Sequence, residues 1–154
     1  MRKRITKPGG APEGKSEQWL DLPSLAQVEL SSECRSSPIE GALAAAGSGW
    51  RAAGSGNQFI RVVFDRPHRL RRIHLEFFEK EIERTQEFSL RWSKDSRSYE
   101  EIVRQQWNFS PAGATRQVED YRVDLSDVAA LELHIVPDIS GGSAVASLAR
   151  LRLA

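Results

Sequence analysis

The sequence predicts an all-β fold, an antiparallel β-sandwich of about eight strands. Apolar and polar residues alternate with a period of two in segment after segment of the 154-residue chain. Such alternation buries one face of a strand and leaves the other face in water, as in antiparallel sheets. Turn-forming residues separate these segments, and few stretches of the sequence have a helical alternative.

The expected strands follow one another in order and cover residues 26–32, 57–65, 70–78, 87–93, 99–109, 120–125, 130–136 and 146–153. In each strand, every second side chain is expected to face the core. The inward set begins with Ile60, Val62, Phe64, Ile73, Leu75, Phe77, Phe88, Leu90 and Trp92, and continues with Val103, Gln105, Trp107, Phe109, Tyr121, Val123, Leu125, Leu131, Leu133, Ile135, Ala149, Leu151 and Leu153. Residues 38–47 can hold one helical turn before their glycines end it, and the charged segment 79–87 can form a turn.

The length of the chain suits one domain with a hydrophobic core, because 154 residues leave little room for a second. Residues 1–17 are rich in Gly, Pro, Lys and Arg, which is typical of a flexible N-terminal tail. Apolar anchors begin with Trp19, Leu20 and Leu22. We therefore expect a tail over residues 1–17 and a single β-sandwich domain over residues 18–154.

Charge and composition narrow the classes of partner. The 22 Lys and Arg nearly balance the 21 Asp and Glu, so nucleic acid is an unlikely partner for a chain of net charge +1. No apolar run approaches the ~20 residues that span a bilayer, and no membrane partner is expected. The basic start has no apolar stretch behind it, and the only cysteine is Cys34, so the expected location is the cytoplasm.

The order of several landmarks resembles one protein family. A Gly-rich loop over residues 44–56 contains Trp50 and leads into the strand 57–65. Ser93, Asp95 and Tyr99 then have the spacing of the pattern S-x-D-G-x-x-W/Y-x-x-V, with Val103 one position after its end, and a Pro/Gly loop precedes a last strand. This succession resembles the discoidin family, also called the factor V/VIII type C family, over residues 18–154. The resemblance implies a galactose-binding-like jelly-roll sandwich.

Two departures from the family pattern bear on metal binding and on a turn. Many members hold structural calcium with an Asp-Gly-Asp type loop and a Glu on the last strand, but this chain has AAAGSGW (44–50) and LARLRL (148–153) there. Calcium prefers six to eight oxygen ligands, several of them anionic, so we expect no metal and no other cofactor. Ser96 and Arg97 stand where the family turn carries glycine, and we expect Asp95 to preserve the turn with its side chain.

No catalytic constellation emerges from the sequence, and an enzyme is not expected. His68, His74 and His134 are far apart, and none has a partner at metal-ligand spacing. His74 and His134 alternate with Glu76 and Glu132 on outward faces, where two readings stay open. They form either a shared polar patch or, as ordinary sheet faces favour, separate cross-strand ion pairs.

Ligand contacts are expected mainly on loops, because a sandwich holds its end loops in place. The candidate loops are 44–56, 79–87, 106–117 and 137–143, and the sequence does not show whether they converge. Trp50 is expected to plug the core, and the aromatic pair of QQWNFSP (105–111) is expected to be buried rather than to stack on a sugar. The candidate ligand-binding residues are Arg51, Asn57, Arg104, Gln106, Trp107, Asn108 and Asp138.

Two functions follow from these features. The first is a non-catalytic binding module that resembles carbohydrate-binding discoidin-like domains, with a carbohydrate as partner. The second is an intracellular adaptor or homo-oligomerising domain that binds protein, since Arg and Trp are enriched at interaction hot spots. A homodimer through a sheet face is a variant of the second.

Overall fold

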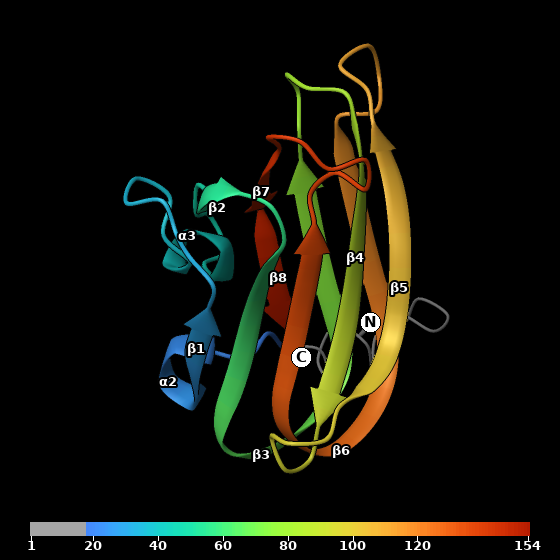
Figure 1. Ribbon diagram of the computed structural model, residues 1–154. Coiled ribbons are helices and arrows are strands. Elements are labelled where there is room, and N and C mark those ends of the chain that lie inside the picture. The colour runs from blue at the N-terminus through green and yellow to red at the C-terminus, as the bar shows by residue number, and fades with distance from the viewer. Residues whose placement is uncertain (1–17) are drawn as a thin grey trace, which may run out of the picture.

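The computed structural model describes residues 18–154, so the tail predicted for residues 1–17 lies outside the described residues. Two antiparallel layers face each other, which confirms the predicted β-sandwich (Figure 1). The elements are α2 (Leu22–Leu25), β1 (Ala26–Leu30), α3 (Glu40–Leu43), β2 (Trp50–Ser55), β3 (Gln58–Phe78), β4 (Arg84–Ser93), β5 (Glu100–Phe109), β6 (Arg116–Val136), β7 (Val145–Leu148) and β8 (Arg150–Leu153). Among the described residues, no helix has the length and apolar character to cross a membrane.

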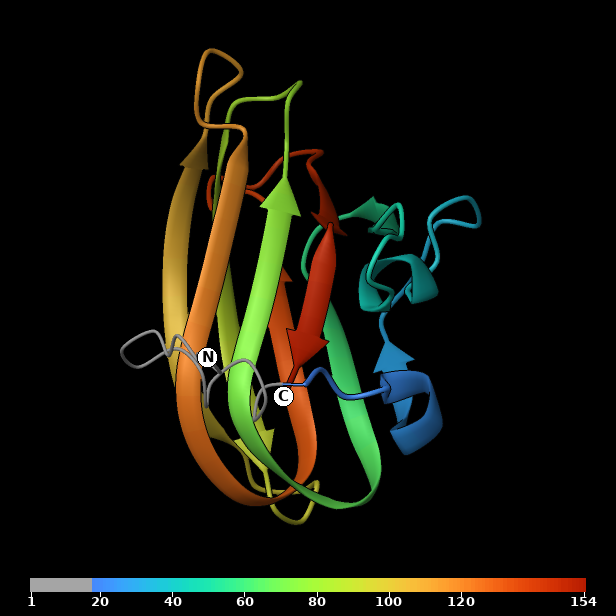
Figure 2. The same cartoon turned by 180° about the vertical axis from the view of Figure 1, so that it is seen from behind.

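Two long strands, β3 and β6, each pass through both layers. Each of the two strands bends between its first and second half, at the end of the molecule that is at the bottom of Figure 1. The front sheet has the order β1, first half of β3, second half of β6, β4 and β5. The back sheet consists of the second half of β3 between β8 and the first half of β6 (Figure 2). The register of β3 against β6 shifts between Val63 and Arg72, where both strands bend.

The observed strands differ from the predicted ones in how five of the predicted ranges are joined or divided. Residues 57–65 and 70–78 belong to one continuous strand, as do 120–125 and 130–136, because hydrogen bonding persists on both sides of each bend. Residues 146–153 divide into β7 and β8. Ala149 is therefore not an inward residue: it lies in the break, where the buried positions change from Ala146 and Leu148 to Leu151 and Leu153. Strand β2 was not predicted.

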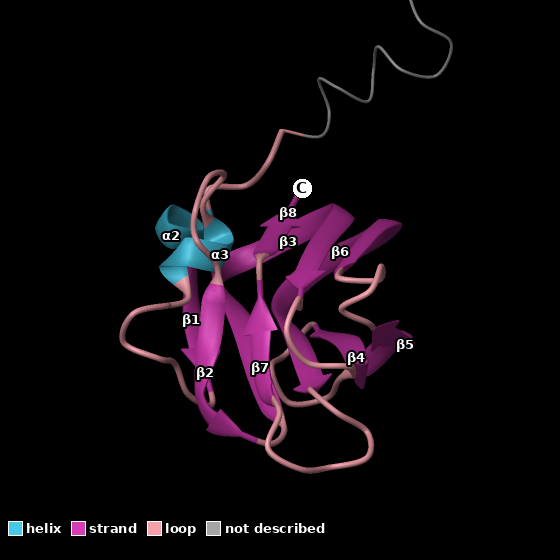
Figure 3. Ribbon diagram, turned by 90° about the horizontal axis from the view of Figure 1, so that it is seen from above, coloured by secondary structure: helices cyan, strands magenta, loops and turns pink. Residues whose placement is uncertain are grey.

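The inward residues of the other strands form one core between the sheets. Most predicted inward side chains are buried, and the largest of them are Phe64, Phe77, Phe88 and Phe109. Trp50 is 1% exposed and donates from Nε1 to the Ser32 carbonyl at 3.1 Å, so it plugs the core as predicted. Viewed along the strands, α2 and α3 cover the corner beside β1 and β2, opposite β5 (Figure 3).

The interior between β4 and the first half of β6 is polar. Arg84 is 4% exposed and donates to Glu79 and to the Pro137 carbonyl, and its guanidinium lies 5.2 Å from the centre of the Phe109 ring. Gln86 donates to Gln117 at 3.4 Å across the two sheets. Each of these buried polar groups has partners, which their removal from water requires. They join the end loops to the core.

Three glycines bring the loop after α3 close to itself and to β7. A Cβ at Gly47 would lie 2.0 Å from the Gly41 carbonyl oxygen, and a Cβ at Gly41 would lie 2.7 Å from the Gly49 oxygen. Gly49 has a φ of +90°, a conformation that L side chains rarely adopt. Backbone atoms cannot yield as a side chain can, so this loop requires glycine.

We expect Gly47→Ala to lower the free energy of unfolding by about 2 kcal/mol, because the methyl group has to displace backbone at Gly41. The loss corresponds to a fall of roughly 5 °C in thermal midpoint. Gly54→Ala is the control, since a Cβ there meets nothing within 4 Å. Calorimetry of both variants checks this, and equal midpoints would contradict the close packing of the loop.

The turn between β4 and β5 is built by one carboxylate. Oδ1 of Asp95 accepts the backbone N–H groups of Arg97 and Ser98 at 2.8 and 2.9 Å and the Ser93 hydroxyl at 2.9 Å. These hydrogen bonds, led by Ser98, lower the pKa of Asp95 from 3.8 to about 2. Ser96, where the family pattern has glycine, takes a φ of +62°. Asp95 thus preserves the turn, as predicted.

The depressed pKa of Asp95 predicts a pH-dependent contribution to stability. Folding favours the ionised carboxylate, so the contribution is complete above the ordinary pKa of 3.8 and is lost as the pH falls toward 2. Asp95→Asn keeps an acceptor oxygen without the charge. Wild type should be more stable than this variant at pH 6, and the gap should close between pH 4 and pH 2.

Urea unfolding of both proteins across that range measures the gap. Asp65→Asn is the control, because Asp65 is exposed and no described residue donates a hydrogen bond to its carboxylate. A gap between wild type and Asp95→Asn that stays constant from pH 6 to pH 2 would contradict the assignment.

Candidate functional site

An open pocket of about 300 Å³ lies where β4 ends and β5 begins. It is lined by Trp92, Ser93, Lys94, Asp95, Ser98 and Glu100. All six come from one hairpin, because β4 and β5 pair in antiparallel register with Trp92 opposite Glu100. The hairpin turn is at the same end of the sandwich as the bends of β3 and β6 (Figure 1). The volume of the pocket is at the lower end of the range typical of ligand pockets.

Trp92 supplies the apolar surface of this pocket. It occupies an inward position of β4 and packs against the core, yet it remains partly exposed because it stands at the open end of the sandwich. The ammonium of Lys94 lies 5.8 Å from the centre of the Trp92 ring, within the range of a cation–π contact. The core contacts fix the ring before any ligand arrives.

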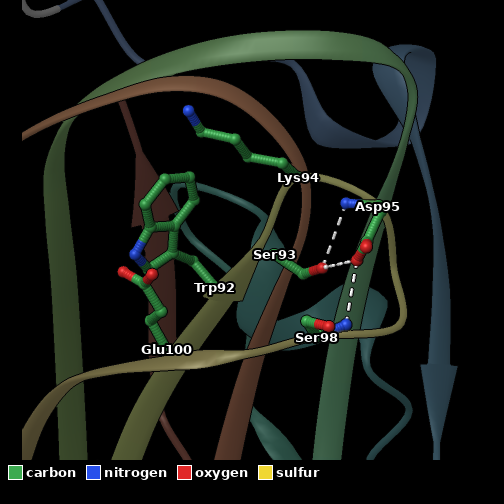
Figure 4. Close-up of a pocket in the computed structure, with 6 residues that line it drawn as sticks. All are labelled: Trp92, Ser93, Lys94, Asp95, Ser98 and Glu100. Carbon is green, nitrogen blue, oxygen red and sulfur yellow. Dashed lines mark hydrogen bonds between the residues drawn. The ribbon is translucent and has the colours of Figure 1, made fainter.

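Polar groups surround the indole on the other sides (Figure 4). Oδ1 of Asp95 is occupied by the turn, whereas no described residue donates to Oδ2. The Ser93 hydroxyl donates to Asp95. The exposed side chains of Lys94, Ser98 and Glu100 remain as donors and acceptors for a ligand. A fixed aromatic ring with acceptors on one side and a cation on the other can hold a small ligand with apolar faces and hydroxyl edges.

The sequence-predicted ligand residues do not form one site. Arg104, Gln106 and Asn108 lie on the outer face of β5, as predicted for the outward set. Arg104 pairs with Glu101 at 2.8 Å and Glu87 at 3.0 Å, and these carboxylates raise the pKa of its guanidinium. Gln106 donates to Glu87, and Asn108 accepts from Thr85. Much of the hydrogen-bonding capacity of this row is used within the protein.

The other four predicted residues lie at three places. Asn57 and Asp138 line a shallow pocket of about 40 Å³ beside Pro137, and the carboxylate of Asp138 accepts from the backbone and hydroxyl of Ser140. Arg51 is exposed on β2 and lines a separate pocket of about 190 Å³. Trp107 points between the sheets and is partly buried.

The end loops do lie at one end of the sandwich, at the top of Figure 1. Gly56 donates to Ala144, Ile139 donates to Thr85 at 2.9 Å, and Glu79 donates to Thr115 at 2.8 Å. Each loop thus contacts the next in a row from β2 to β6. This end is opposite the Trp92 pocket, so the loops and the pocket cannot act as one site.

None of the six pocket residues is among the ligand-binding candidates that the sequence predicted. Trp92 was expected to face the core, which it partly does, and Ser93 and Asp95 were noted only for the turn pattern. No role was predicted for Lys94, Ser98 or Glu100. The signal that could have found them is a large aromatic at the last inward position of a strand that ends in the Asp95 turn. Such a residue lies at the rim of the core, where one part of the ring stays accessible.

Neither a metal site nor a histidine patch is found among the described residues. Within residues 18–154, no three His, Cys, Asp or Glu side chains gather closely enough to hold a metal ion. His74 lies on the back sheet and His134 on the front sheet, so they share no patch. His74 instead contacts Asp120 across the strands at 2.9 Å, as the favoured reading expected, and also contacts Glu76 of its own strand at 3.0 Å.

No protein-family profile and no curated protein sequence matches the chain. Solved structures do match it. The family 32 carbohydrate-binding module of AlyQ, in complex with 4,5-unsaturated mannuronic acid, has a TM-score of 0.63 and 17% identity over 89% of this chain and 98% of that one. A pectin-binding carbohydrate-binding module has a TM-score of 0.60 and 16% identity over 84% of this chain and 89% of that one.

The family 32 module of C. perfringens NanJ, in complex with galactose, has a TM-score of 0.64 and 12% identity, over 89% of this chain and 98% of that one. Several other matches are parts of larger chains, such as an alginate lyase and a glycoside hydrolase. At these identities the likeness concerns the fold. The chain has the galactose-binding-like jelly-roll fold that its resemblance to discoidin domains predicts.

Proposed function

We propose that this protein is a non-catalytic carbohydrate-binding module whose ligand site is the Trp92 pocket. The observation that carries the proposal is a partly exposed indole, fixed by core contacts, with Lys94, Asp95 and Glu100 around it. Solved structures with this fold include modules bound to galactose and to unsaturated mannuronic acid and one described as pectin-binding, which supports the same ligand class.

The chemistry of a pyranose matches the arrangement of the pocket. One side of a sugar ring carries C–H groups that pack on an aromatic face, and its edges carry hydroxyl groups that both donate and accept. Oδ2 of Asp95 and the Glu100 carboxylate are acceptors for hydroxyl hydrogens, and the Lys94 ammonium is a donor to hydroxyl oxygens. A volume of about 300 Å³ suits one sugar unit, with the rest of a chain in solvent.

The pKa of Asp95 supports binding rather than glycoside hydrolysis. Hydrolases require a carboxylic acid that holds a proton near neutral pH, which means a raised pKa. The turn lowers the pKa of Asp95 to about 2, so this group is ionised near neutral pH and is not suited to act as the general acid there. Its function in the proposal is to shape the turn and accept a hydroxyl hydrogen.

A protein-binding domain is the second candidate. The observation in its favour is a set of large apolar side chains that are 42–52% exposed, namely Phe78, Ile82, Val118 and Ile139. A homodimer through such side chains would appear in light scattering as twice the monomer mass. The cytoplasmic location that the sequence suggests stays a prediction and suits this candidate better than the first.

Removal of the pocket groups should abolish sugar binding. We expect Trp92→Ala to weaken binding to neutral galactan by tenfold or more, because the stacking surface is lost. Lys94→Ala combined with Glu100→Gln should weaken it severalfold without touching the core, since both side chains are exposed. Affinity gel electrophoresis and calorimetric titration measure these changes, after a glycan array has identified the preferred sugar.

The control is Lys80→Ala combined with Glu83→Gln, two exposed charges on the loop at the opposite end of the sandwich. This pair changes the same kinds of charge and should leave sugar affinity unchanged. Silence on the glycan array together with a dimer in light scattering would overturn the proposal in favour of the second candidate. Sugar binding that survives both pocket variants would place the site elsewhere.

A further inference from the structure

A second hollow lies on the outer face of the front sheet, which is the face turned away from the core. It has a volume of about 250 Å³, and we call it the Ser89 hollow. Its lining residues are Ser89, Arg91, Arg104, His134 and Val136. They come from three neighbouring strands, β6, β4 and β5, which lie in the front layer of Figure 1. None of them lines the Trp92 pocket.

The register of the strands explains why the sheet is hollowed at this point. Ser89 of β4 lies between His134 of β6 and Arg104 of β5 in one row. The outward neighbours of Ser89 along its own strand are Glu87 and Arg91. A serine side chain is much shorter than these four side chains, so the outer face is lowest at Ser89. The small residue therefore forms the floor of the hollow.

Two polar groups in the hollow have no partner within the described part of the chain. Ser89 is 3% exposed, yet no group in residues 18–154 is hydrogen-bonded to its hydroxyl. The His134 ring likewise makes no hydrogen bond, ion pair or ring contact with residues 18–154. Buried polar side chains in proteins are nearly always hydrogen-bonded. A buried hydroxyl that faces a hollow beside a free imidazole therefore indicates a place for the polar groups of a ligand.

The charges at the rim of the hollow are already paired. Arg104 lies 3.0 Å from Glu87 and 2.8 Å from Glu101, and Arg91 lies 3.7 Å from Glu132. An anionic ligand would be repelled by these carboxylates as well as attracted by the two arginines. A neutral ligand avoids this repulsion. Each guanidinium has five N–H donors, so donors remain for uncharged acceptors.

We propose that the Ser89 hollow binds a neutral sugar unit. The hydroxyl groups of a sugar both donate and accept, which matches the Ser89 hydroxyl, the ring nitrogens of His134 and the remaining guanidinium donors. The Val136 side chain and the imidazole ring supply apolar surface for the C–H groups of the sugar. A carboxylated sugar fits less well, because of the carboxylates at the rim. The inference rests on the proposed carbohydrate-binding function and adds a second site for the same class of ligand.

The test follows the histidine ring signals of the whole chain by NMR during titration with galactotriose, a neutral trisaccharide. We expect the His134 signals to shift until they saturate. The His74 signals should not move, because His74 lies on the back sheet, where Asp120 and Glu76 hold it. The His134 response should persist in Trp92→Ala, since Trp92 lines only the other pocket. Trigalacturonate, the acidic counterpart, should bind more weakly at His134.

Substitutions at the floor should weaken binding at His134 alone. We expect Ser89→Val to lower the affinity by roughly tenfold, because its methyl groups fill the floor and the hydroxyl is lost. Valine is well tolerated on strands. Ser89→Ala, which adds no bulk, should lower the affinity about threefold. Thr85→Val is the matched control, because it removes a hydroxyl from the same face of β4 outside the hollow.

The outcomes separate this inference from the proposed function. Galactan binding that is lost in the Trp92 pocket variants, with His134 signals that never move, overturns the Ser89 hollow and leaves the Trp92 pocket intact. A His134 response that disappears in Trp92→Ala, or an affinity that is equal in Ser89→Val and Thr85→Val, also overturns the hollow as a separate site. Tighter binding of trigalacturonate overturns the neutral ligand class. Binding of no sugar at either place overturns both proposals.

Discussion

The antiparallel pairing of β3 with β6 is the constraint on which the rest of the structure depends. Both strands run through the front and the back sheet, so their two halves form the centre of each layer. Their bend sets the separation of the sheets, which the core side chains then fill. Strands β1 and β4 add to the edges of this pair in front, and β8 adds to an edge behind. Strand β5 extends the front sheet beyond β4, and β2 and β7 pair with each other. The strand period of two then decides which side chains meet inside and which meet outside.

The same pairing arranges the charged outer face of the back sheet. The register puts Arg152, His74 and Asp120 in one row and Arg150 and Glu76 in the next. A shift of one residue would bury these charges, which makes the register strongly specified. The Trp92 pocket has a different origin. It forms at the end of β4, beside the bends of β3 and β6. The inward-facing Trp92 ring there lies at the edge of the core and is partly exposed to solvent.

Strict alternation made the fold and most of the inward set predictable from the sequence, and the Trp50 plug followed from family resemblance. The bends of the two long strands were not predictable from the sequence. Arg66, Pro67 and His68 are typical of a turn, whereas hydrogen bonding continues on both sides of them. The outer face of the back sheet and the proposed ligand site were less predictable still. Arg152 and Arg116 are 36 residues apart, and only the order of the strands brings them to one face. Trp92 has the pattern of a core residue, since exposure at a strand end depends on how far the neighbouring strands extend.

A net charge near zero does not by itself exclude a charged surface on one face of the protein. The argument against nucleic acid used the balance of 22 cations and 21 anions over the whole chain, but a sheet sorts side chains onto faces by parity. On the front sheet, for example, cross-strand pairing places Glu29, Glu87 and Glu132 beside arginines. Stacking on the proposed Trp92 site depends little on ionic strength, while attraction between a charged partner and a charged surface is long-ranged and screened by salt. The salt dependence of binding can therefore distinguish stacking from charge attraction in a chain that its overall composition would describe as neutral.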